Sequence, residues 1–115
     1  MLNIQNHQNG ETSIVTVKGR VNFEVIGQLR AIIREVLTNE QPKLLVINME
    51  GVPFIDSAGI GLLVSVHNSI GTTHGDLRLC GMSSPVKEIF DRTNLATYFS
   101  IFATERDALL ALHDI

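Results

Sequence analysis

The sequence predicts an α/β fold with a mixed, mostly parallel sheet, an N-terminal hairpin and helices packed mainly on one face. Three observations lead to this prediction. Two strand-like segments near the N-terminus flank a turn dipeptide, and the later apolar segments alternate between strand-like and helix-like periodicity. The length of 115 residues suits a single domain over residues 1–115. Strands separated by helices imply parallel pairing, so we expect the order β β α β α β α β α.

The first two elements are expected to form a hairpin. Residues Asn3–His7 alternate weakly between apolar and polar side chains, and Ile14–Val17 is rich in β-branched residues. Between them stands Asn9-Gly10, a dipeptide typical of tight hairpin turns. We expect the second strand to end at Gly19.

An amphipathic helix follows. Its apolar side chains recur at three-and-four spacing and form one stripe: Val25, Ile26, Leu29, Ile32, Ile33, Val36 and Leu37. Asn22 is expected as the N-cap, with the charge of Glu24 in the first turn. Asn39 and Pro42 are expected to close the helix.

The middle of the chain predicts a buried strand followed by a second helix. Leu44–Ile47 is a continuous apolar run, which is typical of a strand covered on both faces. The second helix is expected to begin at Asp56 and Ser57 and to run to about Ser69. Its inner side would carry Ile60, Leu63, Val66 and Ile70. Another strand is expected at Leu77–Cys80.

The C-terminal part predicts a helix, a short strand and a last helix. Ser84 is expected as an N-cap because Pro85 follows it, and proline favours the first helical position. A short strand is expected over Phe99–Phe102. Thr104 begins a pattern resembling a capping box. The helix that it opens would carry Leu109, Leu110 and Leu112.

Composition argues against several classes of function. The net charge is −3 and the basic residues are scattered singly, so we expect no direct contact with nucleic acid. The single cysteine, Cys80, excludes an internal disulfide and is expected to be a small half-buried hydrophobe on a strand. The N-terminus resembles no signal peptide, and no apolar run approaches the ~20 residues that cross a bilayer. We therefore expect a cytoplasmic protein without membrane contact. We also expect a monomer, although nothing in the sequence determines the oligomeric state.

The segment Phe54–Leu63 is the most informative. A buried strand leads to Asp56 and Ser57 at the start of a helix, where Asp56 can cap the first turn and the Ser57 hydroxyl can face solvent. Gly59 and Gly61 each cost about 1 kcal/mol in a helix interior. They suggest that another surface approaches closely. In a plainer interpretation, Asp56 and Ser57 only cap the helix and the glycines only permit tight packing.

A phosphoryl group on Ser57 would change the chemistry of this helix start. It would add about −1.5 to −2 units of charge beside the Asp56 carboxylate. The helix dipole partly tolerates that charge. A partner docked over the turn would not, because it would have to desolvate the phosphate against a carboxylate. The motif therefore predicts an interface that modification can switch.

The segment Phe54–Leu63 resembles the signature of the STAS domains of bacterial anti-sigma factor antagonists. The shared pattern is Asp-Ser, a small residue, then Gly-apolar-Gly after an apolar strand. The resemblance extends over nearly the whole chain and implies the STAS fold. It implies that Ser57 is a phosphoacceptor. The partner-binding residues that it implies are Asn22, Asp56, Ser57, Ala58, Gly59, Ile60 and Gly61. Asn22 departs from the family, which usually has Asp there.

The resemblance also implies partners and a non-enzymatic role. In that family, the unmodified antagonist binds an anti-sigma factor that is also a serine kinase, and a sigma factor is released. The kinase then phosphorylates the motif serine, the antagonist leaves, and a serine phosphatase resets it. No cofactor is implied. A second role known in the family stays open, namely a phosphorylation-independent adaptor subunit of a membrane transporter or another complex.

Three chemical alternatives have weaker support in the residues. A serine hydrolase needs glycine two residues before its nucleophile, and Ile55 stands there before Ser57. A P-loop needs a Lys-Ser/Thr pair after its glycines, which is missing after Gly61. A metal site would need a third ligand beside His67 and His74, and none has suitable spacing. We therefore expect no metal and interpret both histidines as solvated polar residues.

Overall fold

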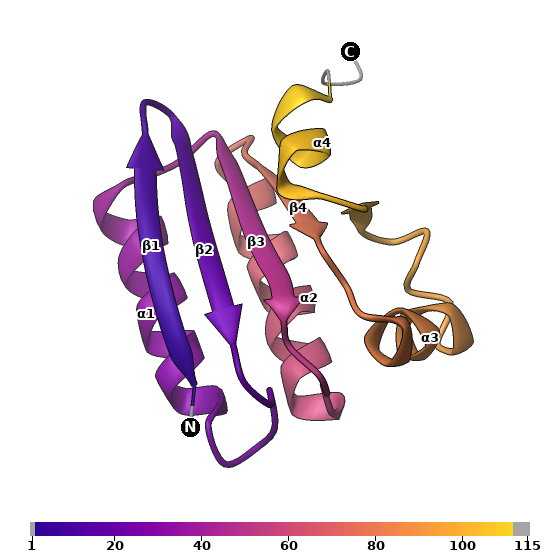
Figure 1. Ribbon diagram of the computed structural model, residues 1–115. Helices are drawn as coiled ribbons and strands as arrows, with labels where there is room; N and C mark the ends of the chain where they lie inside the picture. Colours follow the sequence, from indigo (N-terminus) through magenta and orange to yellow (C-terminus); the bar gives the residue numbers. More distant parts are fainter. Residues whose placement is uncertain (1, 112–115) are drawn as a thin grey trace.

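The computed structural model describes residues 2–111, which build a five-stranded sheet of order β1-β2-β3-β4-β5 with four helices (Figure 1). In chain order the elements are β1 (Asn3–Asn9), β2 (Thr12–Lys18), α1 (Ile26–Asn39), β3 (Leu44–Gly51), α2 (Ser57–Gly71), β4 (Asp76–Cys80), α3 (Ser84–Arg92), β5 (Ser100–Phe102) and α4 (Glu105–Leu110). The pair β1–β2 is antiparallel and the other pairs are parallel. The predicted element order and the mixed, mostly parallel sheet are confirmed.

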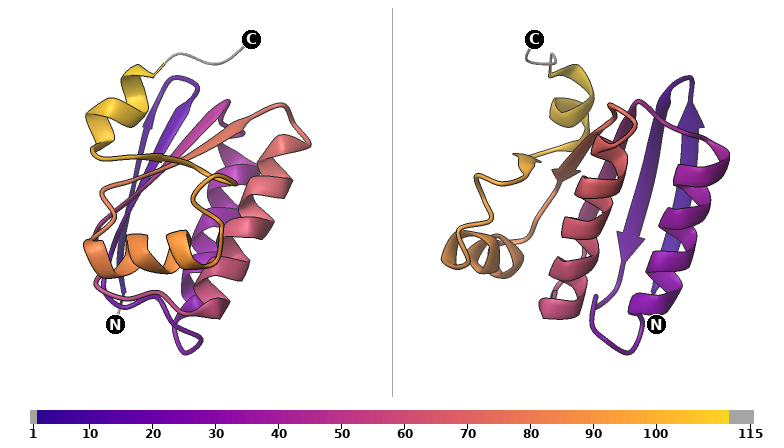
Figure 2. Two further views of the ribbon diagram at one scale, coloured as in Figure 1. Left: turned by 90° about the vertical axis from the view of Figure 1, so that its right-hand side faces the viewer. Right: turned by 180° about the vertical axis from the view of Figure 1, so that it is seen from behind.

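The helices are distributed unequally over the two faces of the sheet. Helices α1 and α2 lie side by side on one face, as the view from behind shows (Figure 2). Helix α4 packs on the opposite face over β3 and β4, and α3 lies beside the β4–β5 side of the sheet (Figure 1). The expectation that the helices pack mainly on one face therefore holds for the two long helices, while α4 is the exception.

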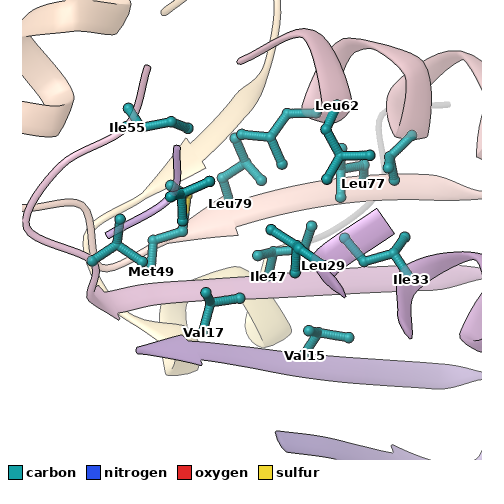
Figure 3. Packing of buried hydrophobic residues seen from close by; sticks show 14 of the residues in the cluster. Val15, Val17, Leu29, Ile33, Ile47, Met49, Ile55, Leu62, Leu77 and Leu79 are labelled. Carbon is teal, nitrogen blue, oxygen red and sulfur yellow. The ribbon is translucent and has the colours of Figure 1, made fainter. Parts of the chain in front are cut away.

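The main core lies between the sheet and the two long helices. Side chains from three strands meet side chains from α1 and α2 (Figure 3). The strands contribute Val15, Val17, Ile47, Met49, Leu77 and Leu79, and the helices contribute Leu29, Ile33 and Leu62. A smaller cluster under α4 contains Leu44, Val46, Cys80 and Ala108. Strand β3 is thus buried on both faces, as its continuous apolar run predicted.

The predicted hairpin turn is confirmed. Asn9 pairs with Thr12, so Gly10 and Glu11 form a two-residue loop between β1 and β2. Gly10 has φ +63°, in the left-handed region that glycine adopts without a steric penalty. The turn therefore needs glycine at this position, which explains why its dipeptide could be recognised from the sequence.

The predicted N-cap of the first helix is wrong. Helix α1 begins at Ile26, with Val25 at the cap position and no side-chain cap. Asn22 lies upstream, and its side-chain oxygen accepts a hydrogen bond from the backbone N–H of Glu24 (3.0 Å). Glu24 is consequently outside the first helical turn. Asn22 forms a local turn instead, which is a common alternative use of this side chain.

A tertiary contact explains the late start of α1. Val21 forms an isolated parallel bridge with Ile55, the residue just before Asp56. The Val21 N–H donates to Phe54 O (2.9 Å), and the Asp56 N–H donates to Val21 O (3.1 Å). The chain is therefore held extended at Val21 and has to turn before a helix can form.

Helix α3 begins one residue earlier than predicted. Ser83 occupies the cap position, Ser84 is the first helical residue and Pro85 the second. The Ser83 hydroxyl does not cap the helix but donates to Val52 O (3.3 Å). The backbone N–H groups of the first two helical residues have no acceptor within the helix, so proline fits at either position. The sequence therefore could not show whether Pro85 is the first or the second residue of α3.

The last elements follow the prediction with shifted ends. Strand β5 begins at Ser100, one residue later than expected, and α2 ends at Gly71 rather than near Ser69. Thr104 is confirmed as the cap of α4, accepting from the N–H of Asp107 (3.1 Å). The side chain that α4 buries is Ala108, whereas Leu109 and Leu110 are exposed. Leu112 lies outside the described residues.

Candidate functional site

Asp56 caps helix α2, as predicted. Its Oδ1 accepts hydrogen bonds from the backbone N–H groups of Ala58 (3.0 Å) and Gly59 (3.1 Å). Ser57 is the first residue of the helix and is exposed to solvent. The serine hydroxyl therefore stands at the positive end of the helix dipole, beside a carboxylate that already occupies two of the free amides.

The second oxygen of Asp56 makes a contact that sequence reasoning missed. Oδ2 accepts a hydrogen bond from the backbone N–H of Phe23, at 2.9 Å. Phe23 belongs to the loop between β2 and α1, which is 33 residues away in sequence. One carboxylate thus connects the start of α2 to this loop. Nothing in the sequence indicates the contact, because it depends on how the chain folds back over the sheet.

The structure brings the predicted partner-binding residues to one end of the molecule. The loop after β2 and the start of α2 both lie at the lower end in Figure 1. Ser57 and Gly61 are exposed, while Asn22, Asp56, Ala58 and Ile60 are partly exposed. Gly59 is buried. Six of the seven predicted residues therefore present surface to solvent, and Gly59 does not.

Gly59 permits close packing within the protein itself. A Cβ atom added there would lie 2.6 Å from Cγ1 of Ile55 and 2.8 Å from Cγ1 of Val21. At Gly61, by contrast, an added Cβ would meet no atom within 4 Å. The plainer interpretation of the motif is therefore correct for Gly59, where the surface that approaches closely is the bridge between Val21 and Ile55.

Phe23 is a residue of this surface that sequence reasoning missed. Its side chain is 72 % exposed, the largest fraction among the exposed large hydrophobic residues of the described chain. It directly follows Asn22, and its own N–H is bound to Asp56. The sequence did contain an indication that Phe23 is exposed, because this apolar residue stands between Asn22 and Glu24 and lies off the apolar stripe of α1. Large exposed aromatic side chains are common anchors at protein interfaces.

Cys80 is buried, more deeply than the half-buried position expected from the sequence. Burial, together with the nearby carboxylates of Glu105 and Glu50, raises the pKa of its thiol from an ordinary 9.0 to about 11. The thiol is thus protonated at neutral pH. A protonated and inaccessible thiol is a poor nucleophile, which agrees with a purely structural role.

The histidines differ from the expectation in one respect. Within residues 2–111, no group of three or more potential metal ligands is present. His74 is exposed, as expected, in the turn after α2. His67 is not a solvated residue: its ring packs 4.7 Å from the ring of Tyr98 and 5.7 Å from that of Phe99. These aromatic residues precede β5, so only the folded chain brings them to α2.

No helix in the described part of the chain is long and apolar enough to span a membrane. What the site offers is an exposed hydroxyl next to a fixed carboxylate, together with an exposed aromatic ring.

Comparisons with known proteins agree with this fold. The anti-sigma F factor antagonist of Paenibacillus polymyxa is 23 % identical over 111 residues, covering 96 % of this chain and 95 % of its own. The crystal structure of an anti-sigma factor antagonist from Mycobacterium paratuberculosis superposes with a TM-score of 0.89 at 24 % identity, covering 99 % of this chain and 96 % of that one.

Two further solved structures share the fold. One is the Bacillus cell fate determinant SpoIIAA in its phosphorylated form, with a TM-score of 0.73, 23 % identity, and coverage of 93 % of this chain and 96 % of that one. The other is a sulfate transporter family protein from Wolinella succinogenes, with a TM-score of 0.76, 23 % identity, and coverage of 90 % and 85 %. The STAS domain family matches residues 3–108, which is nearly the full length. The chain therefore belongs to the STAS domain family.

Proposed function

We propose that the protein is an anti-sigma factor antagonist that acts through phosphorylation-controlled binding. In its unphosphorylated form it binds an anti-sigma factor with serine kinase activity, so that a sigma factor is released. Phosphorylation of Ser57 ends the binding, and a serine phosphatase restores it. Membership of the STAS family and the similarity to a full-length relative named anti-sigma F factor antagonist support this proposal.

The position of Ser57 is the observation that carries the proposal. The residue is exposed at the first position of α2, directly after the capping Asp56. A kinase can therefore reach the hydroxyl without unfolding the helix. In the reaction, Ser57 Oγ takes the terminal phosphoryl group of a nucleoside triphosphate. The hydroxyl proton is released, and the nucleoside diphosphate leaves.

The charge of the phosphate explains how binding would be switched off. It adds about −1.5 to −2 units of charge next to the Asp56 carboxylate. Any displacement of the Asp56 carboxylate costs hydrogen bonds, because both of its oxygens accept from backbone N–H groups. A partner over this surface would have to desolvate two adjacent anions. Each ~1.4 kcal/mol of such a penalty weakens binding tenfold.

The docking surface would consist of the exposed residues at this end of the molecule. Asn22, Ser57, Ala58, Ile60 and Gly61 present surface there. Gly59 contributes by keeping α2 close to the Val21–Ile55 bridge rather than by direct contact. Asn22 carries no charge, so the anionic groups of the unmodified surface are fewer than in relatives with Asp at this position.

The first experiment uses purified protein variants as baits for partners from the source cell. Ser57→Ala cannot be phosphorylated, and Ser57→Asp adds a fixed negative charge. Ser69→Asp is the matched control, because it places the same charge on an exposed position near the other end of α2. Captured proteins are identified by mass spectrometry, and each is then titrated in purified form against the three variants.

We expect a protein with an ATP-binding kinase fold on the Ser57→Ala and Ser69→Asp baits, but not on Ser57→Asp. A purified kinase should also phosphorylate the wild-type chain and leave Ser57→Ala unmodified. If all baits instead retain the same membrane-transport subunit, the switch is refuted and the adaptor role applies. The structural similarity to a sulfate transporter family protein makes that outcome a specific alternative.

A further inference from the structure

The carboxylate of Asp56 contacts backbone on both of its sides. Oδ1 holds the N–H groups of Ala58 and Gly59 in the first turn of α2. Oδ2 holds the N–H of Phe23, at 2.9 Å, in the loop between β2 and α1. Any force that displaces this carboxylate therefore acts on two segments at once.

Phe23 depends on few other contacts for its position. The residue is 72 % exposed, so its ring is not fixed by core packing. The backbone before it is held at Val21 by the bridge to Ile55, and α1 begins after it at Ile26. Between these two fixed points, the hydrogen bond to Asp56 joins the loop directly to α2.

A phosphoryl group on Ser57 would compete with Asp56 for the start of the helix. Its oxygens are strong acceptors, and the amides of the two residues that follow Ser57 in the helix are those that Asp56 Oδ1 already occupies. The two anions would also repel each other at this short sequence distance. Competition for the helix amides and repulsion between the anions both move the Asp56 carboxylate out of its present position.

We propose that Asp56 couples the phosphorylation state of Ser57 to the backbone of Phe23. When Ser57 is phosphorylated, the carboxylate shifts, the Phe23 N–H loses its acceptor, and the loop that presents the exposed ring becomes loose. The partner then loses an ordered aromatic contact in addition to meeting an unfavourable charge. This inference rests on the proposed function in one point, because it takes Ser57 as the modified residue.

The coupling can be measured without any partner. The protein is prepared with phosphoserine incorporated at position 57, and the amide resonance and hydrogen-exchange rate of Phe23 are measured by NMR. Asp56→Asn provides the reference for a lost bond, because Asn keeps an oxygen that can cap α2 but presents an NH₂ group towards the Phe23 N–H. Asp56→Ser is a second reference with a single side-chain oxygen.

Two controls are needed. The first separates the effect of negative charge at position 57 from that of side-chain shape, and the second separates a specific effect on Phe23 from a disturbance of the whole protein. Ser57→Asn has nearly the shape of Ser57→Asp without its charge, and it should leave the Phe23 amide unchanged. The amide of Asp107, which Thr104 caps in α4, should not respond to any of these changes. The remaining spectrum reports whether each variant is folded.

We expect the Phe23 amide proton of the phosphorylated protein to move upfield, towards its position in Asp56→Asn. Its exchange should become about fivefold faster or more, the factor that corresponds to a net hydrogen bond of about 1 kcal/mol. If the Phe23 amide stays in place while those of Ala58 and Gly59 shift, or if its exchange slows, the coupling is refuted.

This result is independent of the outcome of partner capture. If Ser57→Asp abolishes binding and the Phe23 amide does not respond, the proposed function stands and the coupling fails. If the Phe23 amide responds but binding is the same in all baits, the coupling exists and the proposed function fails.

Discussion

Gly59 and Gly61 lie two positions apart on α2, yet their surroundings are opposite. Gly59 faces Val21 and Ile55, and a Cβ there would approach both side chains more closely than real Cβ atoms do. Gly61 faces open space. The first glycine is needed because of packing, whereas the second only weakens the helix in the isolated protein.

We predict opposite effects of alanine at the two positions. Gly59→Ala should lower the free energy of unfolding by about 1–3 kcal/mol, because overpacking forces Ile55 or Val21 to move. Gly61→Ala should raise it by up to about 1 kcal/mol, since alanine favours a helix and meets no neighbour. Urea unfolding of the two variants provides the measurement. Equal effects in both variants would contradict the packing role of Gly59.

Asn22 and Asp56 show that residue type alone predicts a helix cap only in part. Both are good N-cap residues and both precede a helix. Asp56 caps α2, but Asn22 does not cap α1 and closes a local turn instead. The difference comes from the bridge between Val21 and Ile55, which holds the chain extended where α1 was expected to start.

At the scale of elements, a buried arginine is one of the contacts that hold α4 on the sheet, beside the apolar cluster around Ala108. Arg78 of β4 is 3 % exposed, and its Nη1 donates to the carbonyls of Ala108 (2.6 Å) and Ala111 (2.8 Å) at the end of α4. Its Nε donates to Asp76 (3.1 Å), and its guanidinium lies 5.6 Å from the centre of the Phe102 ring. A cation placed at a helix C-terminus is favourable, and here it also satisfies two carbonyls.

We predict that Arg78→Met detaches α4 more than it disturbs the rest of the fold. The methionine keeps an apolar stem but leaves the two carbonyls without their donor, which should cost about 2 kcal/mol or more. Hydrogen exchange should accelerate in α4 and leave α1 and α2 protected. Arg106→Met, at an exposed position of α4, is the control and should have little effect. Uniform acceleration across the whole chain would argue against a local attachment.

At the scale of the whole molecule, two large apolar side chains are exposed to solvent at opposite ends of the protein. Phe23 is 72 % exposed beside the start of α2, and Leu110 is 65 % exposed at the end of α4. Figure 1 shows α4 at the upper end and the β2–α1 loop at the lower end. Only Phe23 lies next to the proposed phosphorylation site, and its N–H is bound to Asp56.

We predict that the two residues differ in their effect on partner binding. Phe23→Ala should weaken binding of the captured kinase by about tenfold or more, as is typical for an aromatic anchor in a docking surface. Leu110→Ala removes a similar exposed apolar group far from Ser57 and should leave affinity unchanged. Calorimetric titration of the purified proteins measures both. A loss in Leu110→Ala without one in Phe23→Ala would place the interface at the other end.

The sequence by itself determined the order of the elements, the hairpin turn, the doubly covered strand β3 and the cap at Asp56. These features follow from local rules, namely periodicity, turn geometry at Gly10 and capping preference, which act over a few residues. The family pattern around Ser57 is also contiguous, so it could be recognised without a structure.

The tertiary structure alone decided which residues surround Ser57. The Phe23–Asp56 hydrogen bond spans 33 residues, and the Val21–Ile55 bridge spans a similar distance. These contacts delay the start of α1, bury Gly59 and place Phe23, which has an exposed ring, next to Asp56. Local propensities do not contain this information, because each contact depends on the parallel alignment of β2 with β3, which brings the ends of two separate segments together.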